Sequence, residues 1–593
     1  MIKLSDYIAK RLKEVYDIRD IFMISGGGAM HLNDSFGRYL NYICNHNEQA
    51  SAIAAEGYSR VGQKLAVVNV TTGPGGLNCL NGVFGQWTDS VPVLYISGQV
   101  KCSTMMAKTE DKSLRQLGDQ EVDIVNIVKP IVKYAKTVTN PEEIRYILDK
   151  AIFLALQGRK GPVWIDIPID IQSTMIDENN LKEYDETEDT MVFDNNKLEK
   201  QMDGLSGLIK NAKKPLIIAG HGIRLAGAKD EFLNLIKKLN IPVVTTMNGF
   251  DLVSHDNPLF IGRIGTVGNR CANFALQNSD LVISMGSRNN IRQISYNWEN
   301  FAKKAKLVLI DIDKSELDKP TLNPYLKIHS DCKIFIEKLN NLKNLSSKKS
   351  GWLNWCVEIK EKYPNIEIEN ISDKGIEPYN FMNKLSKELS ENEIVITANG
   401  SAFVVYFQAG EVKKNQRYIW NSGDASMGYD LPAAIGACIA SGGKRIVCIA
   451  GDGSMMMNLQ ELQTIKHYNL PIKIFLLNNS GYVSIRQTQN AFFNGRKTAC
   501  CPQSGVSIPS FTDLSKAFGI KTMKIENENE IKARIIKTLE ADEAVLCEVM
   551  LKTDYGFRPK LASKCLEDGT MISSSLENMY PFLDKTEIEK IMI

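Results

Sequence analysis

Long apolar runs and metal-binding patterns are missing from this sequence. No stretch approaches the roughly 18 apolar residues of a membrane-spanning helix, and residues 1–14 alternate in charge where a signal peptide would have an apolar core. The 12 cysteines include no CxxC pair, and the six histidines are widely separated, so nothing indicates a transition-metal cluster. We therefore expect a protein of the reducing cytoplasm without a membrane partner.

An excess of charge of one sign is also missing. Lys and Arg total 71 against 69 Asp and Glu, which gives a formal charge of +2 and no basis for binding nucleic acid. What the chain has is length and core-forming residues. Its 593 residues, 44% of them hydrophobic, provide for about three or four domains of ordinary size.

The most informative motif lies in the last third of the chain. One apolar run ends in Gly-Asp-Gly at 451–453, and a second, after a helical pattern, ends in Asn-Asn at 478–479. A strand that turns into a helix exposes amides that hold a phosphate, and Asp452 and Asn479 offer hard oxygen ligands for Mg²⁺. The pattern predicts a diphosphate bridged by magnesium.

This spacing resembles the signature of thiamine-diphosphate enzymes, in which roughly two dozen residues separate Gly-Asp-Gly from Asn-Asn. The segments 46–49 and 54–58 resemble the part of that superfamily that carries its catalytic glutamate. The resemblance assigns to Glu48 the exchange of a proton with the cofactor's aminopyrimidine ring, a task for a carboxyl group with a raised pKa. Glu56 is the alternative, but its place beside Gly57 matches the packing part of the motif.

Strands and helices alternate along the chain. Apolar runs such as 65–70, 215–219 and 446–450 alternate with helical patterns, which predicts an α/β fold of doubly wound parallel sheets. The polar segments 177–196 and 341–350 indicate connectors. We therefore predict three such domains and a tail, with the bounds 1–176, 197–340, 352–554 and 555–593.

The domain order resembles the acetolactate synthase-like family over nearly the whole chain. The resemblance implies a pyrimidine-binding domain, a middle domain, a diphosphate-binding domain and a C-terminal tail at the active site. Each glycine cluster alone would indicate only a tight turn. Their order is specific, since four motifs recur in the sequence of the family, at 73–76, 89–92, 97–100 and 120–123.

The resemblance also implies roles for single residues. Gly27 and Gly28 would let the backbone approach the cofactor and the substrate, and Gln120 would be the active-site glutamine. Met427 would hold thiamine in its bent form, with core packing as the alternative. Gly481 would offer its carbonyl group to Mg²⁺. The residues expected to meet the diphosphate are Asn399, Gly400, Ser401, Gly453 and Ser454.

FAD binding is left open by the middle domain. Gly220 and Gly222 follow an apolar strand, but the third glycine of the dinucleotide fingerprint is absent. Arg288 and Arg292 resemble the paired arginines of the FAD-binding acetolactate synthases, and Thr246 falls in a further matching loop. Both outcomes remain, a bound flavin or none.

The expected acceptor pocket departs from acetolactate synthase. Asp119 stands where the family has phenylalanine, and the stretch 482–488, which contains Arg486, lacks the usual tryptophan. Because a buried polar site discriminates through hydrogen bonds, these two residues favour a larger or more polar acceptor.

We expect a thiamine-diphosphate- and Mg²⁺-dependent 2-keto acid decarboxylase or carboligase that uses pyruvate as its donor. The acceptor is either a second keto acid, as in acetolactate synthesis, or a ketosugar of surface-polysaccharide assembly. A catalytically silent thiamine- or nucleotide-binding regulator is the alternative of another class, against which the retained Glu48 argues. The resemblance further implies a homodimer or homotetramer, in which two chains complete each site.

Overall fold

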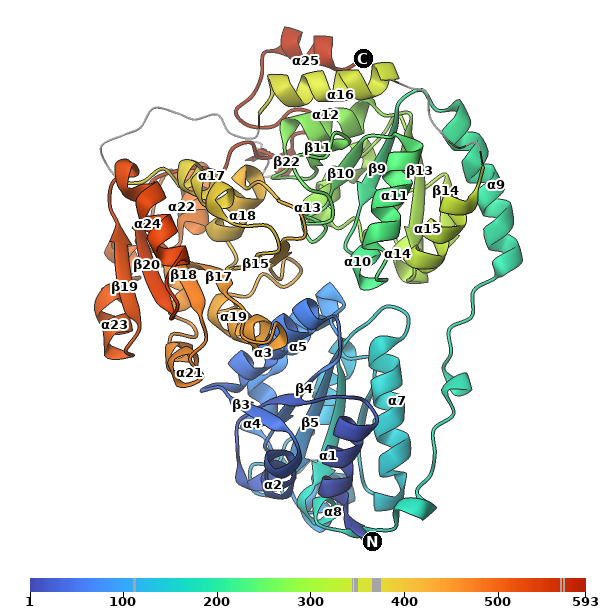
Figure 1. Cartoon of the computed structure of the whole chain (residues 1–593), viewed down its shortest axis with the longest axis vertical. Helices are drawn as coiled ribbons and strands as arrows, with labels where there is room; N and C mark the ends of the chain where they lie inside the picture. Colours follow the sequence, from blue (N-terminus) through green and yellow to red (C-terminus); the bar gives the residue numbers. More distant parts are fainter. Residues whose placement is uncertain (110–112, 344, 346–349, 365–374, 566–567, 569–570) are drawn as a thin grey trace.

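Three six-stranded sheets organise the computed structural model, which describes residues 1–593 except 110–112, 344, 346–349, 365–374, 566–567 and 569–570. Figure 1 shows the first sheet at the bottom, the middle sheet at the upper right and the third sheet at the left. Every pairing within these sheets is parallel, and helices cover their faces, so the predicted α/β class is confirmed. None of the described helices is long and apolar enough to cross a membrane.

The first sheet lies within the first 176 residues. Its strands, in spatial order, are β3 (Asn41–Cys44), β2 (Asp20–Met23), β4 (Ala66–Val70), β5 (Val93–Gln99), β7 (Val163–Pro168) and β6 (Ala135–Thr137). β1 (Ile2–Lys3) pairs separately with β8 (Met175–Ile176). The helices are α1 (Leu4–Glu14), α2 (Met30–Tyr39), α3 (Glu48–Gly62), α4 (Pro74–Asn78), α5 (Leu80–Asp89), α6 (Ile124–Val128), α7 (Ile144–Leu156) and α8 (Ile169–Gln172).

The middle sheet has the strand order of a dinucleotide-binding fold. Its strands are β11 (Phe260–Arg263), β10 (Val243–Thr245), β9 (Pro215–Ala219), β12 (Leu281–Met285), β13 (Lys306–Asp311) and β14 (Leu326–His329). The helices are α9 (Asn195–Asn211), α10 (Gly222–Leu225), α11 (Lys229–Leu239), α12 (Arg270–Asn278), α13 (Ile291–Ile294), α14 (Lys314–Asp318), α15 (Cys332–Asn341) and α16 (Ser350–Lys362). Strand order therefore reverses between β9 and β12.

The third sheet repeats the order of the first. Its strands are β16 (Arg417–Ile419), β15 (Ile394–Thr397), β17 (Ile446–Gly451), β18 (Ile472–Asn478), β20 (Val545–Met550) and β19 (Lys521–Ile525). The helices are α17 (Pro378–Glu388), α18 (Ser401–Ala409), α19 (Asp430–Ala440), α20 (Asp452–Met455), α21 (Glu461–His467), α22 (Val483–Phe492), α23 (Phe511–Ala517) and α24 (Ile531–Leu539). In both sheets the order reverses next to the first strand, between β2 and β4 and between β15 and β17.

The strands expected from apolar runs are present. The runs 65–70, 215–219 and 446–450 form β4, β9 and β17, which are buried along nearly their whole length. Continuous burial is the rule for parallel strands because helices cover both faces of the sheet. The sequence pattern was therefore sufficient to place these strands.

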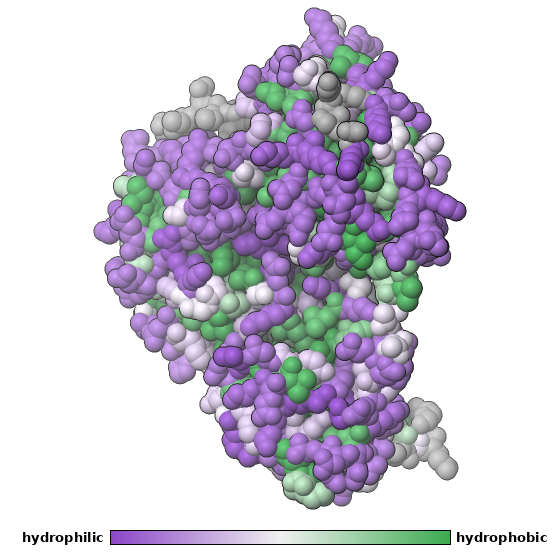
Figure 2. Space-filling model, turned by 45° about the vertical axis from the view of Figure 1, so that its right-hand side comes forward, coloured by the Kyte–Doolittle hydropathy of each residue, from purple (hydrophilic) through white to green (hydrophobic). Residues whose placement is uncertain are grey.

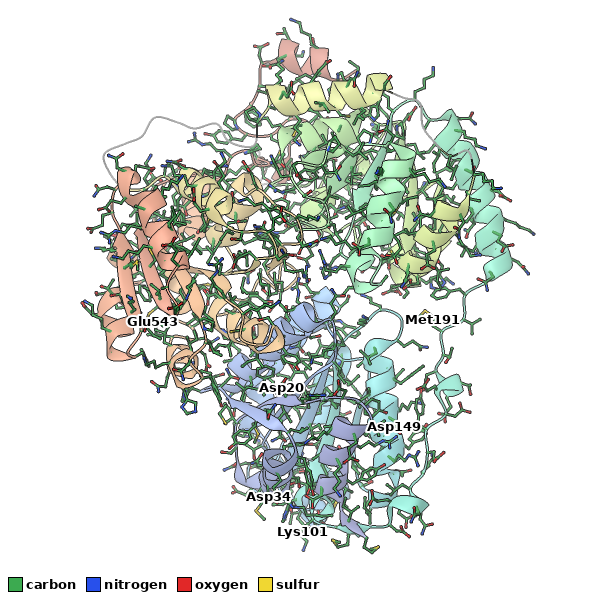
Figure 3. All side chains as sticks on the ribbon, in the orientation of Figure 1. Asp20, Asp34, Lys101, Asp149, Met191 and Glu543 are labelled. Atoms are coloured by element: carbon green, nitrogen blue, oxygen red, sulfur yellow. The ribbon has the colours of Figure 1, made fainter. Side chains whose placement is uncertain are left out.

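The connectors and the tail are less regular than the domains. Between β8 and α9 the chain has only short 3-10 turns, and Figure 3 marks this stretch by Met191. The tail carries β21 (Ser563–Cys565), β22 (Met571–Ser573) and α25 (Lys585–Ile591). It packs on the middle sheet's helices, where Asn278 Nδ2 donates to the Ile591 carbonyl at 3.0 Å.

α16 packs on the middle sheet, although the predicted boundary at residue 352 assigns it to the third domain. Trp352 Nε1 donates to the Pro215 carbonyl at 2.9 Å, and Trp352, Cys356 and Ile359 join the core beside β9 and β12. The polar stretch before α16 suggested a boundary because sequence composition does not show on which sheet a helix packs. The predicted domain bounds otherwise remain predictions.

The first and third domains meet through α3 and α19. A side chain at Gly436 would collide with the Ala54 carbonyl, and one at Gly57 would collide with the Ala433 carbonyl. Only glycine allows these helix backbones to approach so closely. In Figure 2, apolar side chains gather on the visible face in the region between the narrower lower part and the wider upper part of the molecule.

Candidate functional site

Asp452 is held at the carboxyl edge of the third sheet, where β17 passes into α20. Its Oδ1 accepts a hydrogen bond from the Gly453 amide at 2.7 Å, and its Oδ2 accepts from the amides of Asn479 and Gly481 at 3.0 Å each. Burial disfavours the charged carboxylate and raises its pKa to about 6. These bonds tie the Gly-Asp-Gly turn to the Asn-Asn turn, as the sequence spacing predicted.

Asn479 presents an oxygen without a partner. Its Oδ1 is buried and has no hydrogen-bond donor, while its Nδ2 lies 3.5 Å from both Ser401 Oγ and Tyr555 Oη. Buried polar atoms normally have a hydrogen-bond partner. A buried amide oxygen without a donor, next to a buried carboxylate, therefore indicates a binding site for a ligand. Both atoms are of the hard type that Mg²⁺ prefers, and the residues therefore fit this ion.

A cavity of about 1000 Å³ opens at this edge. Met427 lies over it, and a side chain at Gly453 would come within 3.3 Å of Met427 Cε. Gly428 donates its amide to Ser454 Oγ at 2.9 Å, which fixes the Met427 loop on the turn of α20. The predicted site residues that line this cavity are Asn399, Gly400, Ser401, Met427, Asp452, Gly453, Ser454, Asn479 and Gly481.

A second group of predicted residues gathers at the carboxyl edge of the first sheet. Gly28 packs so closely on Thr72 that a side chain there would collide with it, and Gly27 faces open space. A side chain at Gly73 would collide with the Gln120 carbonyl, so this loop lies against the turn before α4. The loops after β2, β4 and β5 thus form one surface.

Glu48 belongs to the same surface as the first residue of α3. Asn47 caps the helix by accepting the Gln49 amide, and Glu48 Oε2 accepts from Asn78 Nδ2 at 2.9 Å. Glu48 is half-buried in the single chain. Glu56, by contrast, is fully buried between Arg60 and Tyr429, and this burial raises its pKa to about 7.

The two groups do not share a cavity within one chain. All described residues that line the large cavity have sequence numbers of 292 or higher. Glu48 and Gln120 are therefore not among them. Gln120 and Asp119 are exposed to solvent. One chain therefore presents two half-sites, one at the edge of each related sheet.

Arg486 does not face the cavity. Its guanidinium donates to the carbonyl groups of Asn479 at 2.7 Å, Thr553 at 2.9 Å and Ser480 at 3.0 Å. These bonds place the guanidinium against the backbone of the Asn-Asn turn, on the side away from the cavity, where it holds the turn in position. The predicted place of Arg486 in an acceptor pocket is therefore wrong, because both of its Nη groups donate to backbone carbonyl groups and the residue is not among those that line the cavity.

A second cavity, of about 360 Å³, lies at the carboxyl edge of the middle sheet. Gly222, Thr246 and Arg288 line it, and Gly220 is bound beside it through its amide to the Met285 carbonyl at 2.9 Å. This is the point where strand order reverses, which is the usual ligand crevice of such sheets. Arg292, expected here with Arg288, lines the large cavity of the third sheet instead.

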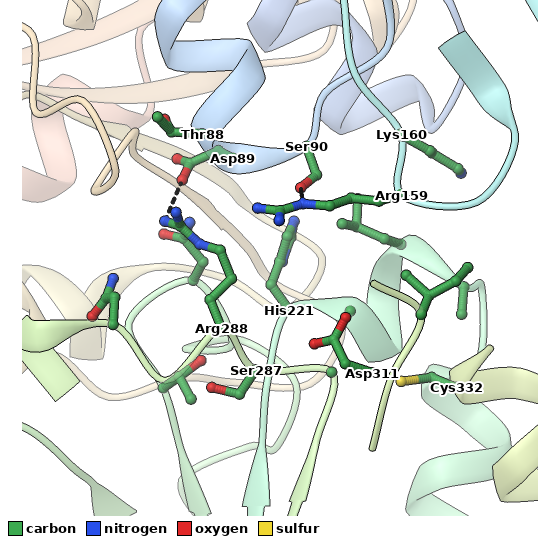
Figure 4. A pocket seen from close by; sticks show the side chains of 18 of the residues that line it. Thr88, Asp89, Ser90, Arg159, Lys160, His221, Ser287, Arg288, Asp311 and Cys332 are labelled. Carbon is green, nitrogen blue, oxygen red and sulfur yellow. Dashed lines mark hydrogen bonds and ion pairs between the residues drawn. The ribbon is translucent and has the colours of Figure 1, made fainter. Parts of the chain in front are cut away.

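Arg159, which the sequence motifs did not identify, also reaches this cavity. Arg159 Nε donates to Ser90 Oγ at 3.0 Å (Figure 4). Arg159 Nη1 lies 2.8 Å from Asp313 Oδ2. Arg288 lies 3.5 Å from Asp89 Oδ1 across the opening. Arg159 comes from the loop before β7, so its place on the middle cavity depends on how the first and middle domains pack.

The fold and the site define an enzyme class with two related parallel-sheet domains and a middle domain of dinucleotide-binding order. Family models agree with each part. They match residues 2–126 as the N-terminal TPP binding domain, residues 202–339 as the central domain and residues 398–549 as the C-terminal TPP binding domain of thiamine pyrophosphate enzymes. The chain belongs to the thiamine pyrophosphate enzyme family.

Its relatives include acetolactate synthase large subunits. The chain is 32% identical over 566 residues to the acetolactate synthase large subunit of Lactococcus lactis, with 94% of each chain covered. It is 32% identical over 569 residues to that of Cyanidium caldarium, with 92% of this chain and 93% of the relative covered. A probable large subunit from Methanococcus aeolicus is 30% identical over 585 residues, with 95% and 94% covered. The predicted resemblance is confirmed.

Proposed function

We propose that this protein is a thiamine-diphosphate- and Mg²⁺-dependent carboligase that decarboxylates a 2-keto acid, with pyruvate as the donor. The observation that carries the proposal is the buried pair of Asp452 and the orphaned Asn479 Oδ1 at the edge of the third sheet. The match to acetolactate synthase large subunits supports the same reaction class. When bound, thiamine diphosphate supplies the carbon nucleophile and the electron sink for decarboxylation.

The chain's own residues hold and orient this cofactor. Asp452, Asn479 and the Gly481 carbonyl are proposed to bind Mg²⁺, and the turns at 399–401 and 453–454 to receive the diphosphate. Met427 covers the cavity at the turn of α20 and would press on the cofactor from one side. Glu48 would exchange the proton on the aminopyrimidine ring, which is the acid-base part of the reaction.

We also propose that two chains complete each site, in a homodimer or homotetramer. The proposed metal ligands and phosphate turns line the large cavity, whereas Glu48, the proposed acid-base residue, is not among its described lining residues. The half-exposed Glu48 and the exposed Gln120 are accessible for contact with a second copy. Leu77, Phe84, Trp87 and Met457 are exposed as well, and such apolar side chains favour burial in an interface.

The acceptor is proposed to be a polar carbonyl compound, such as a ketosugar, with acetolactate formation as the second candidate. Asp119 stands exposed next to Gln120 on the first half-site, and Thr488 lines the large cavity where the sequence lacks a tryptophan. Asp119→Phe is expected to shift products from the ketosugar adduct towards acetolactate, because a carboxylate left unpaired by pyruvate is removed. Mass spectrometry with labelled pyruvate and competing keto acid and ketosugar acceptors measures the shift.

The release of CO₂ from pyruvate serves as the control for Asp119→Phe, and it should change little because the donor-binding residues are untouched. Asp203→Phe, at an exposed aspartate of α9, is a matched surface substitution and should leave the product ratio as in the wild type. Efficient conversion of pyruvate alone to acetolactate by the wild-type protein, with no competing acceptor, would favour an ordinary acetolactate synthase.

FAD is the proposed ligand of the middle cavity. The cavity combines Arg288 and Arg159, suited to a diphosphate, with the carboxyl group of Asp311, suited to a hydroxyl or amino group. Arg288→Ala is expected to weaken FAD binding by about 10- to 100-fold, the effect of losing a charged hydrogen bond. Flavin fluorescence titration measures it, with the exposed Arg19→Ala as control. Equal FAD affinity in wild type and Arg288→Ala would contradict this site.

A further inference from the structure

Basic side chains gather at the outer wall of the large cavity. Arg292, Arg558 and Lys560 all line it, the first from α13 and the other two from the start of the tail. The carboxylates among its described lining residues are Asp452, which is placed at the metal, and the exposed Asp554. Among the described lining residues, basic side chains thus outnumber carboxylates.

These cations are not needed for the cofactor's diphosphate. The turns proposed to receive that group, at 399–401, 452–454 and 479–481, contain no lysine or arginine. Backbone amides, hydroxyl groups and Mg²⁺ are sufficient there, as at other helix N-termini that hold phosphates. Lys560 and Arg292 are therefore available for a different anion.

Backbone hydrogen bonds bring Lys560 and Arg292 to the same wall. The Leu561 amide donates to the Thr266 carbonyl at 2.7 Å, and the Thr266 amide donates to the Arg292 carbonyl at 2.8 Å. Lys560 also exchanges two backbone bonds with Tyr580, which lines the cavity too. The tail thus carries its lysine beside α13 instead of into solvent.

The Lys560 side chain is partly buried, and no described carboxylate forms an ion pair with it. Partial burial lowers the pKa of its ammonium group. A partly desolvated cation is costly unless an anion joins it. Its place on a cavity wall makes a bound ligand the natural source of that anion.

A further part of the cavity wall belongs to α22 and has a mixed character. Ser484, Gln487 and Thr488 offer hydroxyl and amide groups, while Ile485 and Phe492 are exposed apolar side chains. Such a wall suits the hydroxyl groups and the apolar face of a sugar ring. A small keto acid has a single carboxylate, which would pair with one basic side chain. It would leave most of this wall without contacts.

We infer that the acceptor is a phosphorylated carbonyl compound, whose phosphate is bound by Lys560 together with Arg292. The inference rests on the proposed function and specifies its acceptor. In the transfer, the C1–C2 bond of pyruvate breaks with release of CO₂, and C2 forms a bond to the acceptor's carbonyl carbon. The carbonyl oxygen takes up one proton, so the step needs no oxidant or reductant. A phosphate monoester and a sugar diphosphate of a nucleotide share the required chemistry.

The test compares matched acceptors on the holoenzyme. Fructose, fructose 6-phosphate and a nucleotide-linked 4-ketosugar are offered with labelled pyruvate, and KM and kcat are measured for each. Lys560→Met is expected to raise the KM for a phosphorylated acceptor by about 10- to 100-fold, as for the loss of one charged hydrogen bond. Lys560→Arg should restore most of the affinity, and the KM for unphosphorylated fructose should not change. Calorimetry of acceptor binding without pyruvate gives a readout independent of turnover.

Comparison of the two phosphorylated acceptors shows which kind of phosphate group the site binds. Preference for fructose 6-phosphate identifies a monoester, and preference for the nucleotide-linked sugar identifies a diphosphate. The exposed Lys521→Met is the matched control and should behave as the wild type. Equal KM values with and without phosphate, or an equal effect of Lys560→Met on both, would overturn the inference. Absence of CO₂ release from pyruvate would instead reject the proposed function on which it rests.

Discussion

Glu48→Gln is expected to lower turnover by about 10²- to 10⁴-fold, the usual contribution of general acid-base catalysis, while thiamine diphosphate still binds. Glutamine keeps the size of the side chain and an oxygen that can accept the 2.9 Å bond from Asn78. An amide cannot take up and release the proton of a carboxyl group. NMR of hydrogen exchange at the cofactor's C2 atom measures the affected step, and calorimetry measures cofactor binding.

Glu56→Gln is the matched control for this substitution, since it removes the other candidate carboxyl group from the same helix. Glu56 is fully buried and bonded to Arg60 and Tyr429, so its loss should change thermal stability and not the exchange at C2. Exchange at wild-type speed in Glu48→Gln, or its loss in Glu56→Gln alone, would move the catalytic role away from Glu48.

Asp452→Ala is expected to weaken binding of thiamine diphosphate with Mg²⁺ by more than about 100-fold. Mutating a residue that only hydrogen-bonds to a metal ligand typically lowers metal affinity by about 10- to 100-fold. Asp452 is proposed to bind the ion directly, so a larger loss is expected. A ligand at 100 times its Kd stabilises a protein by about 2.7 kcal/mol, so the wild type should melt at a higher temperature with both ligands present. Asp452→Ala should lose this increase, and calorimetry should show the weaker binding directly.

Asn479→Ala should repeat the effect, because its orphaned Oδ1 is the second proposed ligand. Asp554→Ala removes an exposed carboxylate that lines the same cavity and should preserve both the increase in melting temperature and the affinity. Unchanged cofactor affinity in folded Asp452→Ala and Asn479→Ala proteins would show that the metal is held elsewhere.

Mixing the two inactive variants distinguishes shared from separate sites. In a mixed dimer of Glu48→Gln and Asp452→Ala chains, a site formed between chains combines one intact Glu48 with one intact Asp452. Subunit exchange should therefore restore activity, whereas sites contained within single chains would stay inactive. Sedimentation at the assay concentration checks the association, and an active monomer would contradict the shared site.

Local sequence determined the strands and the turns that follow them. β9 and β17 were predictable because an apolar run of five or six residues bounded by glycine or proline fits a strand buried on both faces. Asp452 and Asn479 were predictable together because each ends such a strand, and adjacent parallel strands bring their carboxyl ends to one edge. The family resemblance added Glu48 and Met427, whose roles no local pattern defines.

Tertiary structure decided which side of a turn each long side chain occupies. Arg486 follows the Asn-Asn turn in sequence, yet its guanidinium binds carbonyl groups behind that turn. Arg288 and Arg292 are four residues apart but line different cavities, Arg288 from the loop after β12 and Arg292 from α13. α16 follows a polar segment and still packs on the middle sheet.

The sequence by itself determined the class of fold and the family, and it indicated the edge of the third sheet where we propose that the cofactor binds. The tertiary structure alone decided that Lys560 of the tail, Arg292 of the middle domain and Asp452 of the third domain line one cavity. It also decided that Glu48 lies on a separate half-site in the same chain. The physical reason is the distance along the chain over which residues interact. Strand burial and turn conformation depend on neighbours in sequence. The lining of a cavity depends on how segments far apart in sequence pack together and on which charged side chains they leave without an ion-pair partner.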